Sequence, residues 1–407
     1  MDPRLIGFAV PLFLLLVAVE WLVSRRRGAV VYRFQDSVAS LATGVVQQAS
    51  ELWLGLWAAA SYMYIYERFH LQVWEVDSLA DWLLVGLAVD FLYYWFHRAS
   101  HRVNILWAAH VVHHQSEEYN LTTALRQSSL QPLFNAVFFW PLAVVGVPVT
   151  AVALSFTINL LYQFWIHTRL VGDLGPLEWI LCTPANHRVH HGSDALYLDK
   201  NYGGILIIWD RLFGTYQRER SAPRFGTVTP LRSWNPLWAN VVYFHVMLQK
   251  ARQARRLRDR FYVLVAPPEW QPDSCAPARI EKAPPVGSRY EAWSGRRLSI
   301  YITYQFAISA LVLVFFKLAG AQLADYQAWL LAIYLTLGVT AWGGLFERKR
   351  WAVPLEYSRH VGALVFVVFL LSPLWAGLLV AAIPALSMLW LFGLQWRRVS
   401  VAIGMSR

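Results

Sequence analysis

The stretch Phe96–Gln115 reads FHRASHRVNILWAAHVVHHQ and carries five of the chain's twelve histidines. It holds one HxxxH motif and one HxxHH motif, and a second HxxHH motif follows in Asn186–Gly192, NHRVHHG. Residues three and four apart share one face of a helix, so each motif points its imidazoles toward a common point. The motif histidines are His97, His101, His110, His113, His114, His187, His190 and His191.

Eight imidazoles at this spacing indicate a metal site with two ions. A catalytic zinc ion usually takes about three protein ligands, and the HExxH pattern of zinc proteases is absent from the sequence. A single histidine on an apolar helix is usually a packed core residue, but three clusters at ligand spacing favour metal binding. An all-histidine dinuclear site is therefore the economical interpretation, with iron as the metal if the chemistry uses dioxygen. Zinc can replace iron during purification, because it stands higher in the affinity order.

The composition indicates an integral membrane protein. The chain is 57% hydrophobic and 15% charged, with a mean hydropathy of +0.37, whereas soluble domains are about 25% charged. Its net charge of +11 comes partly from short arginine runs beside apolar segments, which favours lipid headgroups and the positive-inside rule over nucleic acid. The two cysteines, Cys182 and Cys275, provide neither a disulfide framework nor a thiolate metal site.

The apolar segments predict an all-α protein with about nine transmembrane helices. Arg25–Arg27 places the end of the first span in the cytoplasm, and counting spans from there puts the histidine motifs on the cytoplasmic face. His167 follows a predicted hairpin of two spans that ends on the same face, so it becomes a ninth predicted ligand, with an interfacial role as the alternative. The predicted spans lie in Leu5–Val23, Val38–Tyr66, Leu79–Phe96, 132–166 (two), Ile300–Leu318, Tyr326–Phe346 and Val361–Trp396 (two).

The same pattern divides the chain into four parts. Residues 1–78 form N-terminal transmembrane helices, 79–217 the di-iron catalytic domain, 218–297 a cytoplasmic basic amphipathic segment with a proline-rich linker, and 298–407 a C-terminal membrane block without an assigned role. Leu206–Phe213 is too short to span a bilayer and is expected to lie on its surface. Basic residues in the third part indicate an amphipathic helix on lipid headgroups: Arg252, Arg255, Arg256, Arg258 and Arg260.

Metal-binding histidines need hydrogen-bond acceptors that fix their tautomers. Asp90 stands seven residues before His97 on the same helical face, so it could accept from a ligand N–H; an interface residue or a helix–helix hydrogen bond is the alternative. Other acceptor candidates close in sequence to the third motif are Asn186, Asp194 and Asp210.

Two ferrous ions can activate dioxygen to hydroxylate or desaturate an unactivated C–H bond. A site at the membrane surface indicates a lipid substrate, and electrons must come from an external donor, because the sequence has no haem motif, iron–sulfur cysteine set or Rossmann glycine pattern. The alternative class is a non-oxidative metal-binding membrane protein, such as a transporter or zinc-dependent hydrolase. A transport path would place ionisable residues in mid-span, whereas these histidines stand at span ends. The natural lipid and the oligomeric state stay open.

The motifs resemble those of the fatty acid hydroxylase (sterol desaturase-like) superfamily, and most of all its members that cleave ether lipids. The resemblance is dense over roughly residues 80–217 and is carried by Tyr94–Ser128, Tyr162–Thr168, Leu174–Gly192 and Asp199–Tyr216. It implies a di-iron monooxygenase that uses tetrahydrobiopterin and hydroxylates the carbon next to an ether oxygen. The hemiacetal then collapses to a fatty aldehyde and a glycerol derivative.

By the same resemblance, all nine histidines are implied to bind iron. One position departs from the animal members, in which a glutamate follows the second histidine of the first motif; here that residue is Arg102. A hydroxylase or desaturase acting on a sterol, hopanoid, carotenoid or fatty acyl group is the alternative within the superfamily.

Overall fold

A computed structural model describes residues 3–274, 289–291, 295–319, 323–370 and 374–402. Cys275 and most of the proline-rich linker lie outside these ranges. The regular elements of the described residues are helices, and the only bridge among them is an isolated pair, Leu181 with Leu206. The predicted all-helical fold is thus confirmed.

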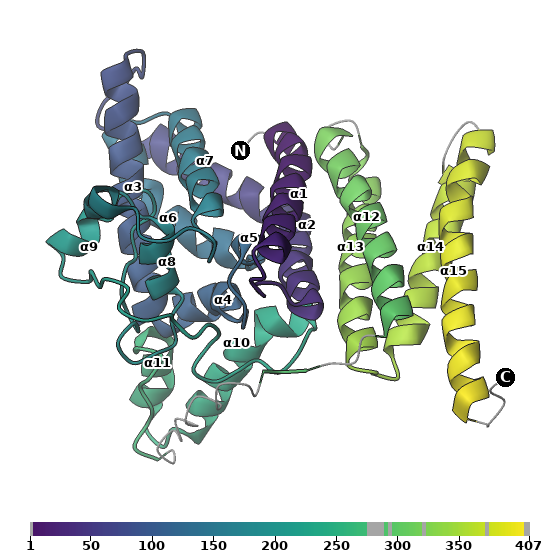
Figure 1. The fold of residues 1–407 in the computed structure, drawn as a ribbon. Coiled ribbons are helices and arrows are strands. Elements are labelled where there is room, and N and C mark those ends of the chain that lie inside the picture. Colours follow the sequence, from purple (N-terminus) through teal and green to yellow (C-terminus); the bar gives the residue numbers. More distant parts are fainter. Residues whose placement is uncertain (1–2, 275–288, 292–294, 320–322, 371–373, 403–407) are drawn as a thin grey trace.

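The helices form two bodies on either side of a central pair (Figure 1). The central helices are α1 (Pro3–Arg26) and α2 (Phe34–Phe69). On one side of them stand α3 (Leu79–Arg102), α4 (Asn104–His114), α5 (Leu121–Ala124), α6 (Gln131–Val145), α7 (Val149–Trp165), the 3₁₀ helix η1 (Gly175–Trp179), α8 (Pro184–His190), α9 (Ile208–Leu212), α10 (Pro236–Gln253) and α11 (Leu257–Val265). On the other side stand α12 (Arg296–Ala319), α13 (Asp325–Phe346), α14 (Ala352–Leu370) and α15 (Leu374–Ala402).

Within the described residues, each of the nine segments predicted as spans contains a helix, but only part of that prediction is supported. Four of the described helices are long and apolar enough to cross a bilayer: α1, α3, α12 and α13. The helices α6 and α7 are apolar but shorter, and α2 carries several polar residues in its first half. The protein is therefore an integral membrane protein with at least these four candidate spans.

A single extended residue, Val103, separates the two helices that carry the first two histidine motifs. Helix α3 begins with a capping box between Ser78 and Asp81, and it ends before Val103, whose φ of −120° and ψ of 119° leave the helical region. Helix α4 restarts at Asn104, whose backbone N–H donates to Ala266 O at 2.9 Å. The chain thus turns between the HxxxH motif on α3 and the HxxHH motif on α4, which lets the two motifs face each other.

The predicted hairpin is the pair α6 and α7. It turns at Gly146, whose φ is +99° and where a Cβ atom would lie only 1.7 Å from Gln72 O. Only glycine satisfies both conditions. After this turn α7 runs back beside α3 and delivers His167, two residues past its last turn, to the other histidines.

Candidate metal centre

The nine predicted histidines converge into two groups. Within each group, one ring nitrogen of every member lies within 4.8 Å of the others. The first group is His97, His101, His110, His114 and His190, and the second is His113, His167, His187 and His191. Each HxxHH motif contributes to both groups, so the two groups share helices α4 and α8. This division supports two ions side by side.

Backbone carbonyls fix the protonation of several rings. A carbonyl oxygen only accepts, so a ring nitrogen bonded to it must carry the proton, and the other nitrogen keeps its lone pair. The Nδ1 contacts of this kind are His97 to Tyr202 O (2.8 Å), His113 to Arg126 O (2.8 Å), His167 to Gln163 O (2.7 Å) and His190 to Lys200 O (3.1 Å). In these four histidines the free lone pair is therefore on Nε2.

These lone pairs point at one another. His113 Nε2 and His167 Nε2 are 3.2 Å apart, although both nitrogens are acceptors by the assignment above. His97 Nε2 lies 3.1 Å from His110 Nε2, and His110 Nδ1 faces the side-chain oxygen of Gln131. Two facing acceptors repel each other, and a cation between them removes the repulsion.

Other ring nitrogens in the centre are buried without a partner among the described residues. They are His101 Nε2, His187 Nδ1, His190 Nε2 and His191 Nε2. A buried nitrogen without a partner costs free energy, and coordination would satisfy it. Neutral imidazole is a usual ligand for iron and zinc, so the residues present fit a pair of such ions.

Burial keeps the centre uncharged. Removal from water lowers the pKa of His113 to about 4, against an ordinary value of 6.5. It also lowers the pKa of His110, His114, His190 and His191 well below that value, and neighbouring imidazoles add to the effect. The rings are thus neutral at pH 7, the form that binds a metal ion.

We expect the metal-free protein to lose stability in mild acid. Above about pH 6.5 the His113 ring is neutral in both states, but at lower pH the unfolded chain binds a proton that the folded chain excludes. The loss contributed by His113 alone approaches about 3 kcal/mol as the pH nears 4. The measurement is thermal unfolding of metal-free protein between about pH 7.5 and pH 5. His113→Ala should flatten this dependence and His245→Ala, at an exposed position outside the centre, should preserve it; equal slopes in all three proteins would contradict the assignment.

The carboxylate of Asp90 bonds elsewhere than to a histidine. It accepts from Asn159 Nδ2 at 2.7 Å, from two backbone N–H groups near Leu206 and from Trp209 Nε1. These bonds match the alternative, a polar contact between α3 and α7 that also holds the Leu206 loop. The prediction that Asp90 accepts from a ligand N–H is wrong in this structure, because backbone carbonyls take that place.

Of the other predicted acceptors, Asp210 acts through the backbone. It accepts from the N–H groups of Tyr202 and Gly203 at 2.8 and 2.7 Å, and it thereby holds the residue whose carbonyl bonds His97. Burial raises the pKa of Asp210 to about 6. Asp194 instead pairs with Arg224.

Asn186 also bonds away from the metal centre. Its amide donates to Leu181 O at 3.2 Å, and its backbone carbonyl accepts from Asn201 Nδ2. Asn186 therefore braces the start of α8 without bonding a histidine ring.

Arg102 is paired with acids outside the two histidine groups. It forms ion pairs with Asp199 and, at 3.0 Å, with Glu269. Both partners offset its charge, so the residue that departs from the family pattern joins α3 to the loops around it.

Two features of the site were not predicted from the sequence: the backbone carbonyls that accept from the histidine rings, and the aromatic side chains that pack against those rings. Tyr119 stacks on His167 with ring centroids 5.5 Å apart, and Trp107 lies 4.9 Å from the ring of His101. Every residue has a backbone carbonyl, so the sequence does not indicate which carbonyls accept from histidines. The chain also has many aromatic residues, and nothing in the sequence distinguishes Tyr119 and Trp107 from the others. Only the acceptor of His167 could be predicted, because Gln163 stands four residues earlier and its backbone carbonyl therefore lies one helical turn before the histidine.

Comparisons with known proteins agree with this site. The fatty acid hydroxylase family model matches residues 82–215, the part that contains all nine histidines. The alkylglycerol monooxygenase of Xenopus tropicalis is 36% identical over 362 residues, covering 88% of this chain and 80% of the relative. The human alkylglycerol monooxygenase is 36% identical over 358 residues, covering 86% and 79%. An ornithine lipid hydroxylase of Rhizobium tropici matches 36% of this chain at 29% identity. No solved structure matches significantly.

The domain match and the histidine centre define a membrane-bound oxidoreductase of the monooxygenase or hydroxylase class. The similarity to the vertebrate enzymes extends well beyond that domain, over most of both chains. The chain belongs to the alkylglycerol monooxygenase family.

Proposed function

We propose that the protein hydroxylates the carbon next to the ether oxygen of alkylglycerol lipids. The hydroxylated product is a hemiacetal, which breaks down to a fatty aldehyde and a glycerol derivative. Dioxygen supplies the inserted oxygen atom, and an external reductant supplies two electrons. The observation that carries this proposal is the pair of facing histidine groups in a chain similar to alkylglycerol monooxygenases over most of its length.

The two histidine groups would hold two iron ions. Iron in such a site supplies oxygen activation, and the ligands keep its charge high because neutral imidazoles do not offset it. The chain's own contribution is orientation: carbonyls and stacked aromatics hold the rings so that their lone pairs stay directed inward. Reduced tetrahydrobiopterin is the proposed electron donor.

The substrate would approach from the side of His101. This histidine is partly exposed, whereas the other eight are buried. Trp107 and Tyr202 flank its ring, with centroids 4.9 and 5.3 Å away. These aromatic faces would guide an alkyl chain toward the first histidine group and limit the access of water.

The membrane arrangement is proposed as nine spans with the centre on the cytoplasmic face. The nine helical segments support the count, and the basic runs at span ends support the orientation. Residues 79–217 would form the catalytic domain, preceded by transmembrane helices in 1–78 and followed by the basic segment 218–297 and the membrane block 298–407.

The decisive assay uses the purified, iron-loaded protein with an alkylglycerol, tetrahydrobiopterin and air. Fatty aldehyde is expected only when both the pterin and iron are present. Oxygen uptake with a sterol or fatty acyl lipid and another reductant, without aldehyde from the alkylglycerol, would assign the protein to another reaction of the superfamily. Absence of turnover with every lipid and reductant would contradict the oxidative function.

A further inference from the structure

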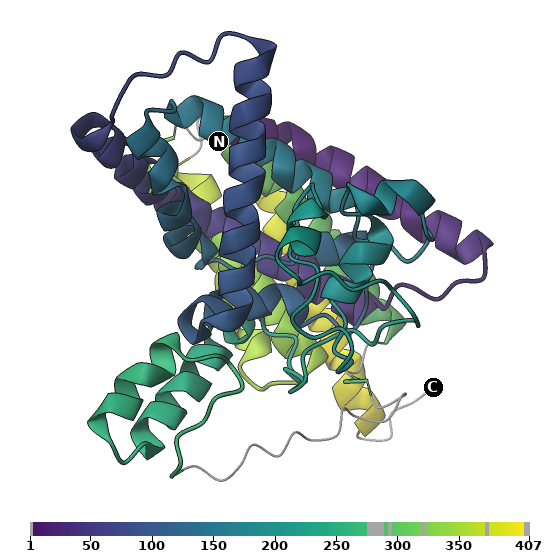
Figure 2. The ribbon, with the colours of Figure 1, turned by 90° about the vertical axis from the view of Figure 1, so that its left-hand side faces the viewer.

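The hairpin of α10 and α11 has an outer surface that the proposed chemistry does not use. Figure 2 shows the two helices side by side at one end of the molecule. On α11 the buried residues are Asp259 and Val263, and Val263 packs with Ala108 of α4 and Met247 of α10. This inner face fixes the hairpin to the helix that carries three of the histidines.

The opposite face of α11 is apolar and uncovered. Leu257 and Phe261 are 66% and 65% exposed, and Leu264 and Val265 are exposed as well. Their spacing of four, seven and eight residues places them on one side of the helix. Helix α10 also exposes apolar residues, among them Trp238 and Leu248. An apolar stripe of this kind is typical of a helix that lies in the surface of a bilayer.

Basic residues flank that stripe. Within residues 252–260 there are five arginines and one acid, Asp259. Among the described residues, the ion pair in this stretch joins Arg258 to Asp259 at 3.5 Å. The excess positive charge would attract anionic lipid headgroups.

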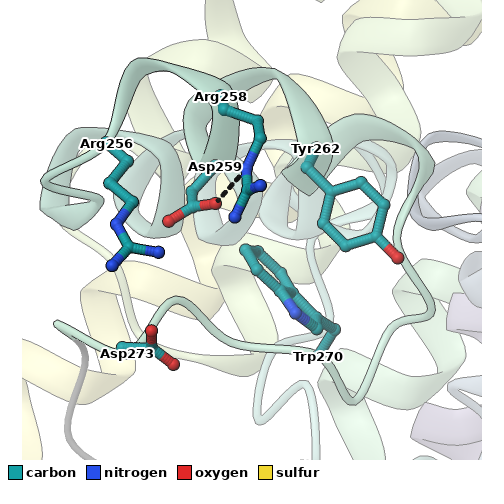
Figure 3. A pocket seen from close by; sticks show the side chains of 6 residues that line it. All are labelled: Arg256, Arg258, Asp259, Tyr262, Trp270 and Asp273. Carbon is teal, nitrogen blue, oxygen red and sulfur yellow. Dashed lines mark ion pairs between the residues drawn. The ribbon is translucent and has the colours of Figure 1, made fainter.

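A surface pocket lies beside the stripe. It has a volume of about 410 Å³ and is lined by Arg256, Arg258, Asp259, Tyr262, Trp270 and Asp273. Figure 3 shows Arg258 on α11 and Arg256 just before its first residue, with Trp270 and Asp273 on the segment that runs beside the helix. Arginine donors suit a phosphate group, and an indole ring suits the boundary between headgroups and acyl chains.

The attachment point places this surface at the edge of the membrane. The candidate span α3 ends at Arg102, and two residues later Asn104 bonds the end of α11. Its backbone N–H donates to Ala266 O, and its side-chain amide donates to Val263 O at 2.8 Å. The end of α11 therefore lies where a span leaves the bilayer, within reach of lipid headgroups.

We propose that the α10–α11 hairpin is a bilayer-surface anchor, and that the pocket of Arg256 and Arg258 binds the phosphate of an anionic phospholipid headgroup. The apolar stripe of α11 would enter the headgroup layer beside the bound lipid. This binding involves residues outside the histidine centre and does not require catalytic activity.

The test uses the full chain in nanodiscs with increasing phosphatidylglycerol in phosphatidylcholine. A nitroxide is attached at Phe261→Cys or, independently, at Leu257→Cys, both in a Cys275→Ser background. The remaining thiol, Cys182, is buried and should not react. Relaxation by oxygen against a water-soluble nickel chelate reports whether the label enters the lipid.

Both labels are expected to move into lipid as phosphatidylglycerol increases. Removing either arginine, as in Arg256→Gln or Arg258→Gln, should raise the fraction of phosphatidylglycerol at which the labels enter lipid by about fivefold. Asp273→Asn should lower it, because an acid is removed from the pocket, and Arg220→Gln, at an exposed position outside the hairpin, should leave it unchanged.

Labels that stay in water at every lipid composition would overturn the proposal, as would equal responses in the arginine variants and Arg220→Gln. Binding of inorganic phosphate tests whether the pocket takes a lipid headgroup or a soluble phosphate. If phosphate binds in neutral bilayers, with loss of binding in Arg256→Gln, and phosphatidylglycerol does not compete, the pocket is a soluble-phosphate site and the lipid proposal is wrong.

Discussion

His113→Ala is expected to abolish turnover, with a loss of about a thousandfold or more, and to reduce bound metal. His113 belongs to the second histidine group, and its Nε2 faces that of His167 at 3.2 Å. Removing it leaves three histidines in that group, while the five of the first group remain. Metal analysis of the purified variant should therefore show a fall from about two ions per chain toward one.

His190→Ala provides the complementary experiment, because His190 belongs to the first group. Each single variant should lose about one ion, and the double variant should lose both. His245→Ala is the matched control: His245 is an exposed histidine that contacts Gln249 on α10. Full metal content in His113→Ala would contradict its ligand role, and a metal content of one ion in the unmodified protein would contradict the dinuclear site.

The sequence was sufficient to predict which histidines meet. Ligand spacing is a local property of helices, so HxxxH and HxxHH motifs at span ends can be found without a fold. The division into two groups could not be predicted in this way. His113 and His114 are neighbours in the chain, yet they belong to different groups, because the assignment depends on how α3, α4 and α8 pack.

The role of Asp90 shows a second limit. A carboxylate on the same helical face as His97 is a reasonable acceptor for a ligand N–H, but the side chain instead bonds Asn159 and the Leu206 loop. The acceptors of the histidines are mostly carbonyl oxygens. Every residue carries such a group, so only the path of the backbone selects the ones that are used.

The C-terminal block contains the feature that the sequence analysis missed most completely. His360 belongs to none of the histidine motifs, but in the structure it neighbours a buried ion pair on α14. Arg359 donates to Glu356 at 2.6 and 3.0 Å, and both side chains are fully buried. Tyr301 of α12 donates to the same carboxylate at 2.8 Å. Buried ionisable residues are thus present in the first two turns of α14, where they bond this helix to α12.

Glu356→Ala is expected to destabilise the protein by about 3–5 kcal/mol, because it leaves the buried guanidinium of Arg359 without its counter-charge. Arg359→Ala should destabilise the protein by a similar amount, because it leaves the buried carboxylate of Glu356 without its counter-charge. The double variant Glu356→Met/Arg359→Met should be less destabilised than the sum of the single variants, since it removes both charges together. Thermal unfolding in detergent, at constant pH and lipid content, measures all of these variants.

The same variants test whether metal binding depends on the stability of the C-terminal block. Helix α13 packs on α2 and α12 on α1. The helices that position the histidines, α3, α4, α7 and α8, stand on the other side of this central pair (Figure 1). If the ion pair only holds α12 and α14 together, Glu356→Ala should lower the unfolding temperature while metal content stays at the unmodified level. If metal is lost in parallel with stability, the block must support the centre through α1 and α2. If the destabilisation of the double variant equals the sum of the two single variants, each charge must have another partner. Two groups that depend only on each other would give a double variant that is less destabilised than that sum.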